Sequence, residues 1–279
     1  MQAGTVRAGC GSIAFHRSAG RTVLGRAFAS SPLRLLTPRN HGDGAWVFLS
    51  SLGGGLVDGD RLDIDVDAAP QTAAFIGTQA STKVYRSSRG TSQHLAIHAA
   101  EGASVALVPD PVVAFAGARY EQRIDVFLDV DASLVLFDAY TCGRAARGER
   151  WQFARFESKT TIAREGRLFF QDSTRLDPAH GAVAERMAGV GVIASVVVIG
   201  PRFVAMRDAL REAATSTATR TPQRAHSDGW TLCSTSPLGS DGLVARIASD
   251  HFENASRALR RSFGALARAL GDDPFARKW

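Results

Sequence analysis

The amino-acid sequence predicts a mainly β fold, built either as an all-β sandwich or as a β-helical stack of short strands. Three observations lead to this expectation. Apolar and polar residues alternate with a period of two through most of the first two thirds of the chain. The alternating runs are short and are separated by Gly, Asp and Pro at spacings of roughly ten residues. Helical periodicity is confined to the C-terminal third.

The alternating strands are predicted in the central part of the chain. The clearest is at residues 62–66, where Leu62, Ile64 and Val66 alternate with three aspartates and give the strand an acidic outer face. Similar patterns predict further strands near 95–97, 105–107, 124–128, 134–137 and 151–156. A hairpin is expected to turn at Glu165-Gly166 and to return through residues 168–170.

Strands and helices mix after residue 190. A continuous apolar run over 190–199 predicts a strand buried on both faces. The period then changes, and a short helix is expected at 203–214, followed by a polar loop at 215–227. Closing strands are expected at 230–233 and 243–247.

The last helix has the strongest pattern, and we predict it over 251–270. Its apolar residues recur at the spacing of one helix face, and its arginines fall on the opposite face. The apolar stripe comprises Phe252, Leu259, Phe263, Leu266 and Leu270, and the arginines are Arg257, Arg261 and Arg268. The helix either packs on the protein's own core with a solvated basic face, or forms a partner-binding surface through Phe252, Arg257, Leu259, Arg261 and Phe263.

Length and composition indicate one substantial core. The chain has 279 residues, of which 45% are hydrophobic, and single cores extend to about 250–300 residues. No convincing internal repeat or linker divides the sequence, so we predict a single β-rich domain over residues 1–279. The three cysteines, Cys10, Cys142 and Cys233, are odd in number and far apart, which fits a reducing compartment. No apolar run approaches the roughly 20 residues of a membrane helix, and we expect a soluble, cytoplasmic protein without membrane contact.

The charge distribution favours protein partners. The net charge is +6 and the pI is near 9.8, and nearly all basic residues are arginine. These arginines are scattered along the sequence and are not interleaved with aromatic residues, so nucleic-acid binding is not favoured. A positive field would instead speed encounters with acidic protein surfaces.

No sequence motif indicates catalysis. The Gly53-Gly54-Gly55 run lacks the following Gly-Lys-Ser/Thr of a phosphate-binding loop, and a turn that needs positive φ explains it. Asp58-Gly59-Asp60 lacks the later ligands of a calcium loop. Ser81 has no nucleophile-elbow context. Polar residues do gather near predicted turns, namely Asp60, Thr78, Gln79, Ser81, Lys83, Tyr85, Asp138, Arg144, Glu149 and Asp172.

Several motifs together resemble one family. The run Gly53-Gly54-Gly55-Leu56-Val57-Asp58-Gly59-Asp60, followed by Thr78-Gln79-Ala80-Ser81-Thr82-Lys83-Val84-Tyr85-Arg86, closely resembles the urease accessory protein family UreD (UreH in some species). The family's other motifs occur in order, as 31–36, Pro109-Asp110-Pro111 with Phe115, Gly143-Arg144, and Arg147-Gly148-Glu149. The resemblance covers roughly residues 31–172.

The resemblance implies a β-helix-like stack and a role without catalysis. It implies a scaffold or chaperone of urease maturation that binds apo-urease, a helical UreF-like protein and a nickel-carrying UreG-like GTPase. No cofactor would be tightly bound, and Ni²⁺ would pass in transit through a polar tunnel. As a hypothesis, Asp60, Ser81, Tyr85, Glu149 and Asp172 line that route, and the last helix contributes to the UreF contact.

Three alternatives stay open from the residues alone. Lys83, Arg144 and Glu149 would equally serve as buried ion pairs that fix the strand stack. The chain could be a hydrolase whose site is assembled from distant residues. It could also be a β-rich binding module for an acidic polymer, held through its arginines.

Overall fold

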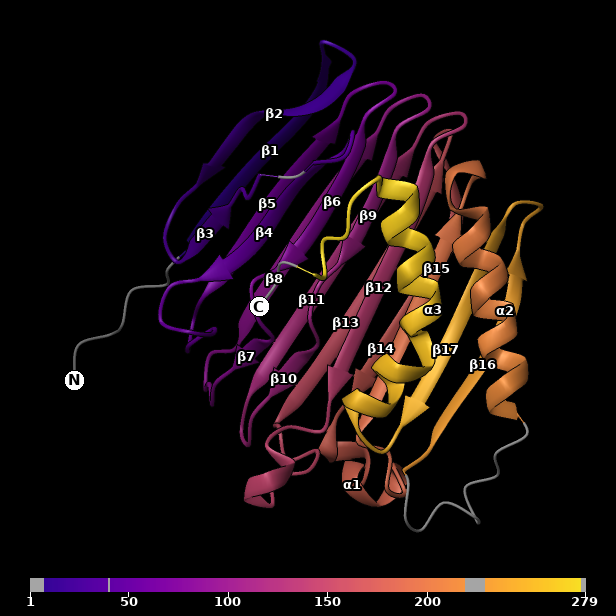
Figure 1. Cartoon of the computed structure of the whole chain (residues 1–279). Helices are drawn as coiled ribbons and strands as arrows, with labels where there is room; N and C mark the ends of the chain where they lie inside the picture. Colours follow the sequence, from indigo (N-terminus) through magenta and orange to yellow (C-terminus); the bar gives the residue numbers. More distant parts are fainter. Residues whose placement is uncertain (1–7, 40, 219–228, 277–279) are drawn as a thin grey trace.

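The computed structural model describes residues 8–39, 41–218 and 229–276. Two β-sheets pack face to face, and two helices cover the outer face of the larger sheet (Figure 1). One apolar core fills the space between the sheets, and a second lies between the larger sheet and the helices. The mainly β, β-helix-like fold with helices near the C-terminus is confirmed.

The smaller sheet has seven strands. Its order is β14 (Arg167–Leu176), β13 (Arg155–Arg164), β11 (Arg119–Leu128), β8 (Thr91–Ala99), β5 (Arg61–Ala68), β1 (Ala8–Ser18) and β2 (Arg21–Ala29). The five strands from β13 to β1 run parallel, and the edge strands β14 and β2 are antiparallel to their neighbours.

The larger sheet has ten strands. Eight follow the order β16 (Thr231–Leu238), β17 (Gly242–Ser249), β15 (Val192–Ile199), β12 (Ser133–Thr141), β9 (Ser104–Val108), β6 (Ala73–Thr78), β4 (Ala45–Ser51) and β3 (Leu33–Leu36). Two short strands lie off this path, β7 (Thr82–Val84) and β10 (Val112–Ala114). Strands β4, β6, β9 and β12 are parallel.

The chain alternates between the sheets from β4 to β13, which creates the stack. Each return to a sheet adds a strand parallel to the previous one, so equivalent residues lie beside each other. In the seven-stranded sheet, for example, one inward row joins Val66, Ile97, Val126 and Ile162, all 0% exposed. The structure therefore repeats although the sequence shows no repeat, because an inward position requires an apolar shape and not a particular residue.

The burial patterns of the strands explain why some strands were predicted from the sequence and others were not. In β5, Leu62, Ile64 and Val66 are buried and the alternating aspartates are exposed, as predicted. Strand β1 was not predicted, because two of its inward positions are Gly9 and Gly11. A Cβ atom on Gly11 would lie 2.7 Å from a Leu33 methyl carbon, so a larger residue there would displace the Leu33 side chain. An inward glycine removes the apolar signal from the alternation.

Both predicted C-terminal helices are present, as α2 (Val204–Ala218) and α3 (Phe252–Leu270). The remaining short elements are α1 (Val183–Arg186) and the 3₁₀ turns η1 (Ala145–Arg147), η2 (Pro178–His180) and η3 (Pro201–Phe203). None of the helices in the described ranges combines the length and the apolar character needed to cross a bilayer.

The predicted loop at 215–227 is wrong for its first four residues, which extend α2 to Ala218. The hydroxyl groups of Thr215 and Ser216 donate to the carbonyls of Arg211 and Glu212, one turn earlier. Polar side chains therefore bond to the helix itself instead of ending it. Residues 219–227 lie outside the described ranges.

Candidate functional site

Polar residues from both sheets face each other inside the molecule. In the seven-stranded sheet, Gln93, Gln122, Ser158 and Thr174 are successive register partners on β8, β11, β13 and β14. In the ten-stranded sheet, Asp138, Ser195 and Arg246 are successive partners on β12, β15 and β17. We call these seven residues the inter-sheet polar row. The strand register aligns them: Gln93, Gln122 and Ser158 lie on parallel strands, and Thr174, Ser195 and Arg246 lie on antiparallel neighbours.

Asp138 is the centre of this row. Gln122 Nε2 donates to Asp138 Oδ1 at 2.9 Å and the Ser158 hydroxyl donates to Asp138 Oδ2 at 2.9 Å. Gln122 Nε2 also lies 3.0 Å from Ser158 Oγ, and the Tyr120 hydroxyl donates to Gln122 Oε1 at 3.2 Å. All four side chains are nearly inaccessible to solvent. The carboxyl group is therefore held by neutral donors, which fix its position.

Burial controls the protonation of this centre. It raises the pKa of Asp138, and the hydrogen bonds from Gln122 and Ser158 oppose that rise. Burial also raises the pKa of the Tyr120 hydroxyl, with the Asp138 charge adding to the effect. Among the described residues, no arginine, lysine or histidine forms an ion pair with Asp138. Asp138 is thus a buried carboxyl group without an ion pair in the described part of the chain, and the charge of Arg246, which lines the same cavity, acts to lower its pKa.

Two cavities adjoin the polar row. The first has a volume of about 310 Å³ and is lined by Gln93 and by residues of the β6–β7 segment, including Thr78, Gln79, Ser81 and Lys83. The second has a volume of about 50 Å³ and is lined by Asp138, Ser158, Asp172, Thr174 and Arg246. Gln93 of the first cavity pairs in register with Gln122, which bonds to Asp138 of the second. The row therefore connects the two cavities through polar side chains.

The glycine turn positions the mouth of the first cavity. Gly53 and Gly54 adopt positive φ values of 85° and 74°, as the sequence predicts. The chain then pairs with β7, where the Leu56 N–H donates to the Lys83 carbonyl at 2.8 Å. Tyr85 N–H returns a bond to the Leu56 carbonyl at 2.9 Å. The turn and the polar segment are thus held together by backbone bonds.

The five route residues predicted from the sequence do not gather at one place. Ser81 lines the first cavity, and Asp172 lines the second and pairs with Arg246. Asp60 is buried, and its carboxylate accepts the Val57 N–H at 2.9 Å, which stabilises the turn. Neither cavity is lined by Asp60.

Tyr85 and Glu149 belong to a separate cluster around Phe115. The Tyr85 ring packs edge-on against Phe115 with centroids 5.2 Å apart, and the Arg144 guanidinium lies 4.3 Å from the Phe115 centroid on its face. Arg144 also forms a bidentate ion pair with Glu149, which lowers the pKa of Glu149. The structural ion pair that the sequence left open is therefore present for Arg144 and Glu149, whereas Lys83 forms no ion pair within the described residues.

Sequence reasoning missed Gln122 and Ser158. A signal exists, because Gln122 interrupts the inward series Tyr120, Ile124 and Val126 of β11. A polar side chain at an inward position of an alternating strand requires a buried hydrogen-bond partner. That partner, Asp138, lies on the opposite sheet and is identified only by the fold.

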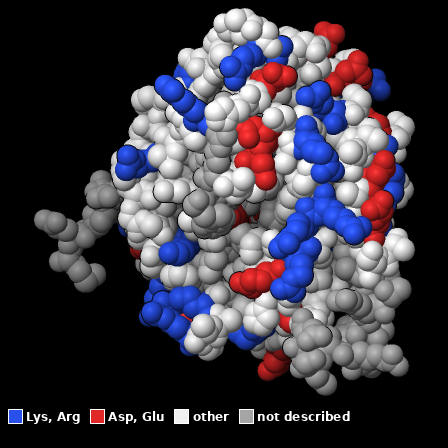
Figure 2. All heavy atoms as spheres, in the orientation of Figure 1, with Lys and Arg blue, Asp and Glu red and all other residues white. Residues whose placement is uncertain are grey.

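The predicted partner-binding residues lie on α3. Leu259 is 1% exposed and packs in the core under the helix. Phe252 and Phe263 are half-buried and line a cavity of about 360 Å³ with Phe137 and Phe275. Arg257 and Arg261 are exposed, and a band of basic side chains runs down the helical face (Figure 2).

Neither a serine nucleophile nor a metal-binding cluster is supported by the described residues. The Ser81 hydroxyl has no histidine or carboxylate partner there, as a nucleophile would require. No group of three or more His, Cys, Asp and Glu side chains in these ranges has an arrangement that could hold a metal ion.

Comparison with known proteins gives a consistent result. The family model described as UreD urease accessory protein matches residues 7–279. The urease accessory protein UreD of Sorangium cellulosum (strain So ce56) is 49% identical, over 98% of this chain and 85% of that protein. UreD of Anaeromyxobacter sp. (strain Fw109-5) is 40% identical, over 98% and 90% of the two chains. Urease accessory protein D of Oryza sativa subsp. indica is 32% identical, over 96% and 95%.

Proposed function

The chain belongs to the UreD family of urease accessory proteins, and we propose that it is a scaffold that passes Ni²⁺, as cargo, along the inter-sheet polar row toward apo-urease. Membership supports a role in urease maturation and partnership with urease and other accessory proteins. The family's name describes an accessory role and not a catalytic one.

The observation that supports nickel passage is the buried Asp138 carboxyl group, which lines the second cavity and is linked through Gln122 and Gln93 to the first. Carboxylate, amide and hydroxyl oxygens are hard ligands, and nickel is held far more firmly by imidazole or thiolate. A carboxyl with a raised pKa must also lose its proton before it binds a cation, which weakens binding near neutral pH. A series of oxygen ligands that bind Ni²⁺ weakly suits the passage of the ion better than its storage.

We also propose that α3 contacts a helical UreF-like protein, which in turn recruits a UreG-like GTPase. The aromatic cavity beside Phe252 and Phe263 offers an apolar anchor, and the exposed Arg257 and Arg261 offer charged contacts at its rim. Interfaces concentrate their binding energy in such aromatic and arginine residues. GTP hydrolysis would belong to the GTPase, since Gly53-Gly54-Gly55 is a turn without a phosphate-binding lysine.

The test replaces Asp138 by Asn in cells that also express urease and its other accessory proteins. We expect less nickel per urease active site and a matching loss of urease activity, because an amide has no charge to attract the cation. Asp60 and Glu149 are less suitable targets, since they stabilise a turn and an ion pair.

Asp125→Asn is the matched control. Asp125 lies on β11 and is also buried, but it faces away from the polar row and pairs with Arg123 and His94. Co-purification of a UreF-like partner should be unchanged in both variants. Full nickel occupancy of urease made with Asp138→Asn would contradict the proposed route.

A further inference from the structure

The outer face of the seven-stranded sheet carries no layer of its own in the described part of the chain. Helices α2 and α3 pack on the ten-stranded sheet, and the apolar cluster beneath them contains only residues of that side. The outward positions of β5, β8, β11 and β13 are therefore available to a partner.

A groove crosses this face where the parallel strands begin. Its volume is about 700 Å³. Five arginines line it, against two glutamates, Glu121 and Glu157. The arginines are Arg61, Arg89, Arg119, Arg123 and Arg155. They come from four separate segments of the chain, and the register of the parallel strands brings these segments together.

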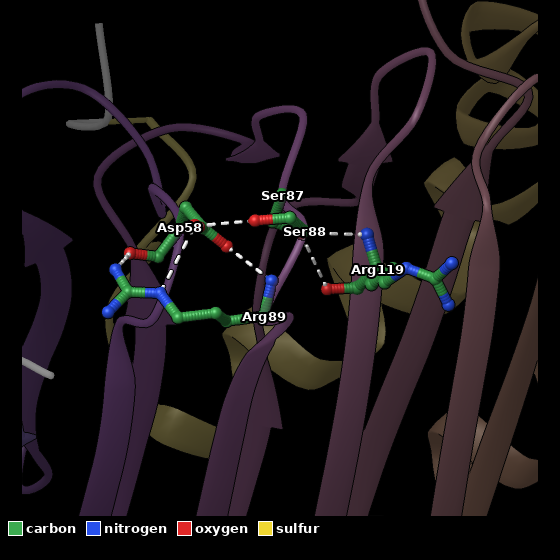
Figure 3. Close-up of polar contacts among 5 residues, drawn as sticks. All are labelled: Asp58, Ser87, Ser88, Arg89 and Arg119. Atoms are coloured by element: carbon green, nitrogen blue, oxygen red, sulfur yellow. Dashed lines mark hydrogen bonds and ion pairs between the residues drawn. The ribbon is translucent and has the colours of Figure 1, made fainter. Parts of the chain in front are cut away.

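A network of polar contacts holds the backbone beside the groove (Figure 3). Asp58 binds the Arg89 side chain at 3.2 Å, the Arg89 N–H at 2.8 Å and the Ser88 hydroxyl at 3.1 Å. The Arg119 N–H donates to the Ser87 hydroxyl at 2.9 Å, which ties the start of β11 to the preceding coil. The Arg119 guanidinium points away from this network (Figure 3). The cations are thus presented from a fixed backbone.

Two of the five arginines have no ion-pair partner in the described part of the chain. Arg89, Arg123 and Arg155 pair with Asp58, Asp125 and Glu157. The guanidinium groups of Arg61 and Arg119 form no hydrogen bond or ion pair within the described residues. A guanidinium presents five donors in a planar fork that matches a carboxylate. These two side chains are ready to receive anionic groups.

We infer that this groove docks an acidic, extended segment of a partner protein, with carboxylates paired to Arg61 and Arg119. The groove borders the inter-sheet polar row at Gln93, but the inference rests on the groove's arginines and not on nickel passage or on the α3 contact. A positive groove would also steer an acidic partner into place.

The groove suits a peptide better than a nucleic acid. Glu121 and Glu157 lie among the arginines and would repel a continuous phosphate backbone, whereas a peptide can place a neutral or basic residue opposite them. Tyr120, the aromatic residue of the lining, is 2% exposed and offers no surface for base stacking. Apolar contacts are available at the far end of the same strands, where Phe127 is 44% exposed and stacks on His98.

The test measures binding of a fluorescent twelve-residue peptide of alternating Glu and Ser to the full chain, by anisotropy. We expect Arg61→Gln with Arg119→Gln to weaken binding by about tenfold, since each exposed charge pair adds a modest amount. The salt dependence of binding should become shallower in the same double variant.

Arg167→Gln is the matched control. Arg167 is exposed on β14, at the opposite end of the strands of the same sheet, and forms no ion pair within the described ranges. Its replacement therefore changes the net charge without touching the groove. Equal peptide affinity in the double variant and in the wild type would overturn the inference. Tighter, equally arginine-dependent binding of a single-stranded oligonucleotide would also overturn it. An unchanged urea midpoint for each variant shows that the fold is intact.

Discussion

Replacement of Asp138 tests the polar network at the centre of the molecule. Asp138→Ala removes the acceptor of both the Gln122 amide and the Ser158 hydroxyl. Each buried donor left without a partner costs about 1–3 kcal/mol. Gln122 retains a contact with Ser158 Oγ at 3.0 Å, which limits the loss. We therefore expect the free energy of unfolding to fall by about 2–4 kcal/mol at pH 7.

Asp138→Asn should behave differently. The amide oxygen can accept from Gln122, and the amide nitrogen can donate to Ser158 once that hydroxyl reverses its role. Both contacts survive, and the burial cost of a charge disappears. The unfolding free energy should then remain within about 1 kcal/mol of the wild type, or exceed it, at pH 7.

The difference in unfolding free energy between the wild type and Asp138→Asn should depend on pH. Because burial raises the pKa of Asp138 in the folded state, the folded protein binds this proton more tightly than the unfolded chain does. The contribution of Asp138 to stability is full below the unfolded-state pKa of about 3.9. It is lost as the pH rises through the folded-state pKa. Asp138→Asn should therefore gain stability relative to wild type as the pH increases.

Urea unfolding at several pH values between 4.5 and 8 measures both effects, with the slope of each curve checking that the unfolded states are comparable. Asp138→Ala as stable as Asp138→Asn would show that the network contributes nothing to stability. A wild-type protein that gains stability relative to Asp138→Asn with rising pH would refute the raised pKa.

Two further predictions concern the core and the thiols. Ile97→Ala, in the inward row of β8, should lower the unfolding free energy by about 2–5 kcal/mol. His98→Ala, on the outer face of the same strand, should change it by about 1 kcal/mol at most. Equal losses in urea unfolding would contradict the assigned faces. A thiol reagent near pH 8 should label the exposed Cys10 rapidly, and should label Cys142 and Cys233 only after denaturation. Burial raises the pKa of the Cys142 thiol, and it raises that of Cys233 to about 11. Rapid labelling of more than one thiol in the native protein would contradict the burial of these two.

The sequence predicted strands with a clear apolar–polar alternation and missed several without it, among them β1 and the almost fully buried β4 and β6. Leu62, Ile64 and Val66 give β5 a clear alternation, whereas Gly9 and Gly11 hide that of β1. The helix α3 was predicted within one residue at its start, since its apolar stripe is long and regular. The end of α2 was not, because side-chain to backbone bonds of Thr215 and Ser216 offset their low helix preference.

The candidate site was predicted only in outline. The sequence singled out Ser81, Asp138 and Asp172 among polar residues near predicted turns, but Asp138 and Asp172 lie in the middle of β12 and β14. It could not indicate that Asp60 stabilises a turn or that Glu149 belongs to a cluster around Phe115. Likewise, the arginines look scattered along the chain, yet five of them line one groove.

Local patterning alone determined the clearly alternating strands and the two C-terminal helices, since each such pattern is complete within about ten to twenty neighbouring residues. The family motifs likewise identified its relatives. Only the tertiary structure decided which polar side chains meet, because partners such as Gln122 and Asp138 lie on different sheets. Their meeting depends on the register of every coil between them, and a shift of one residue would turn each side chain to the opposite face.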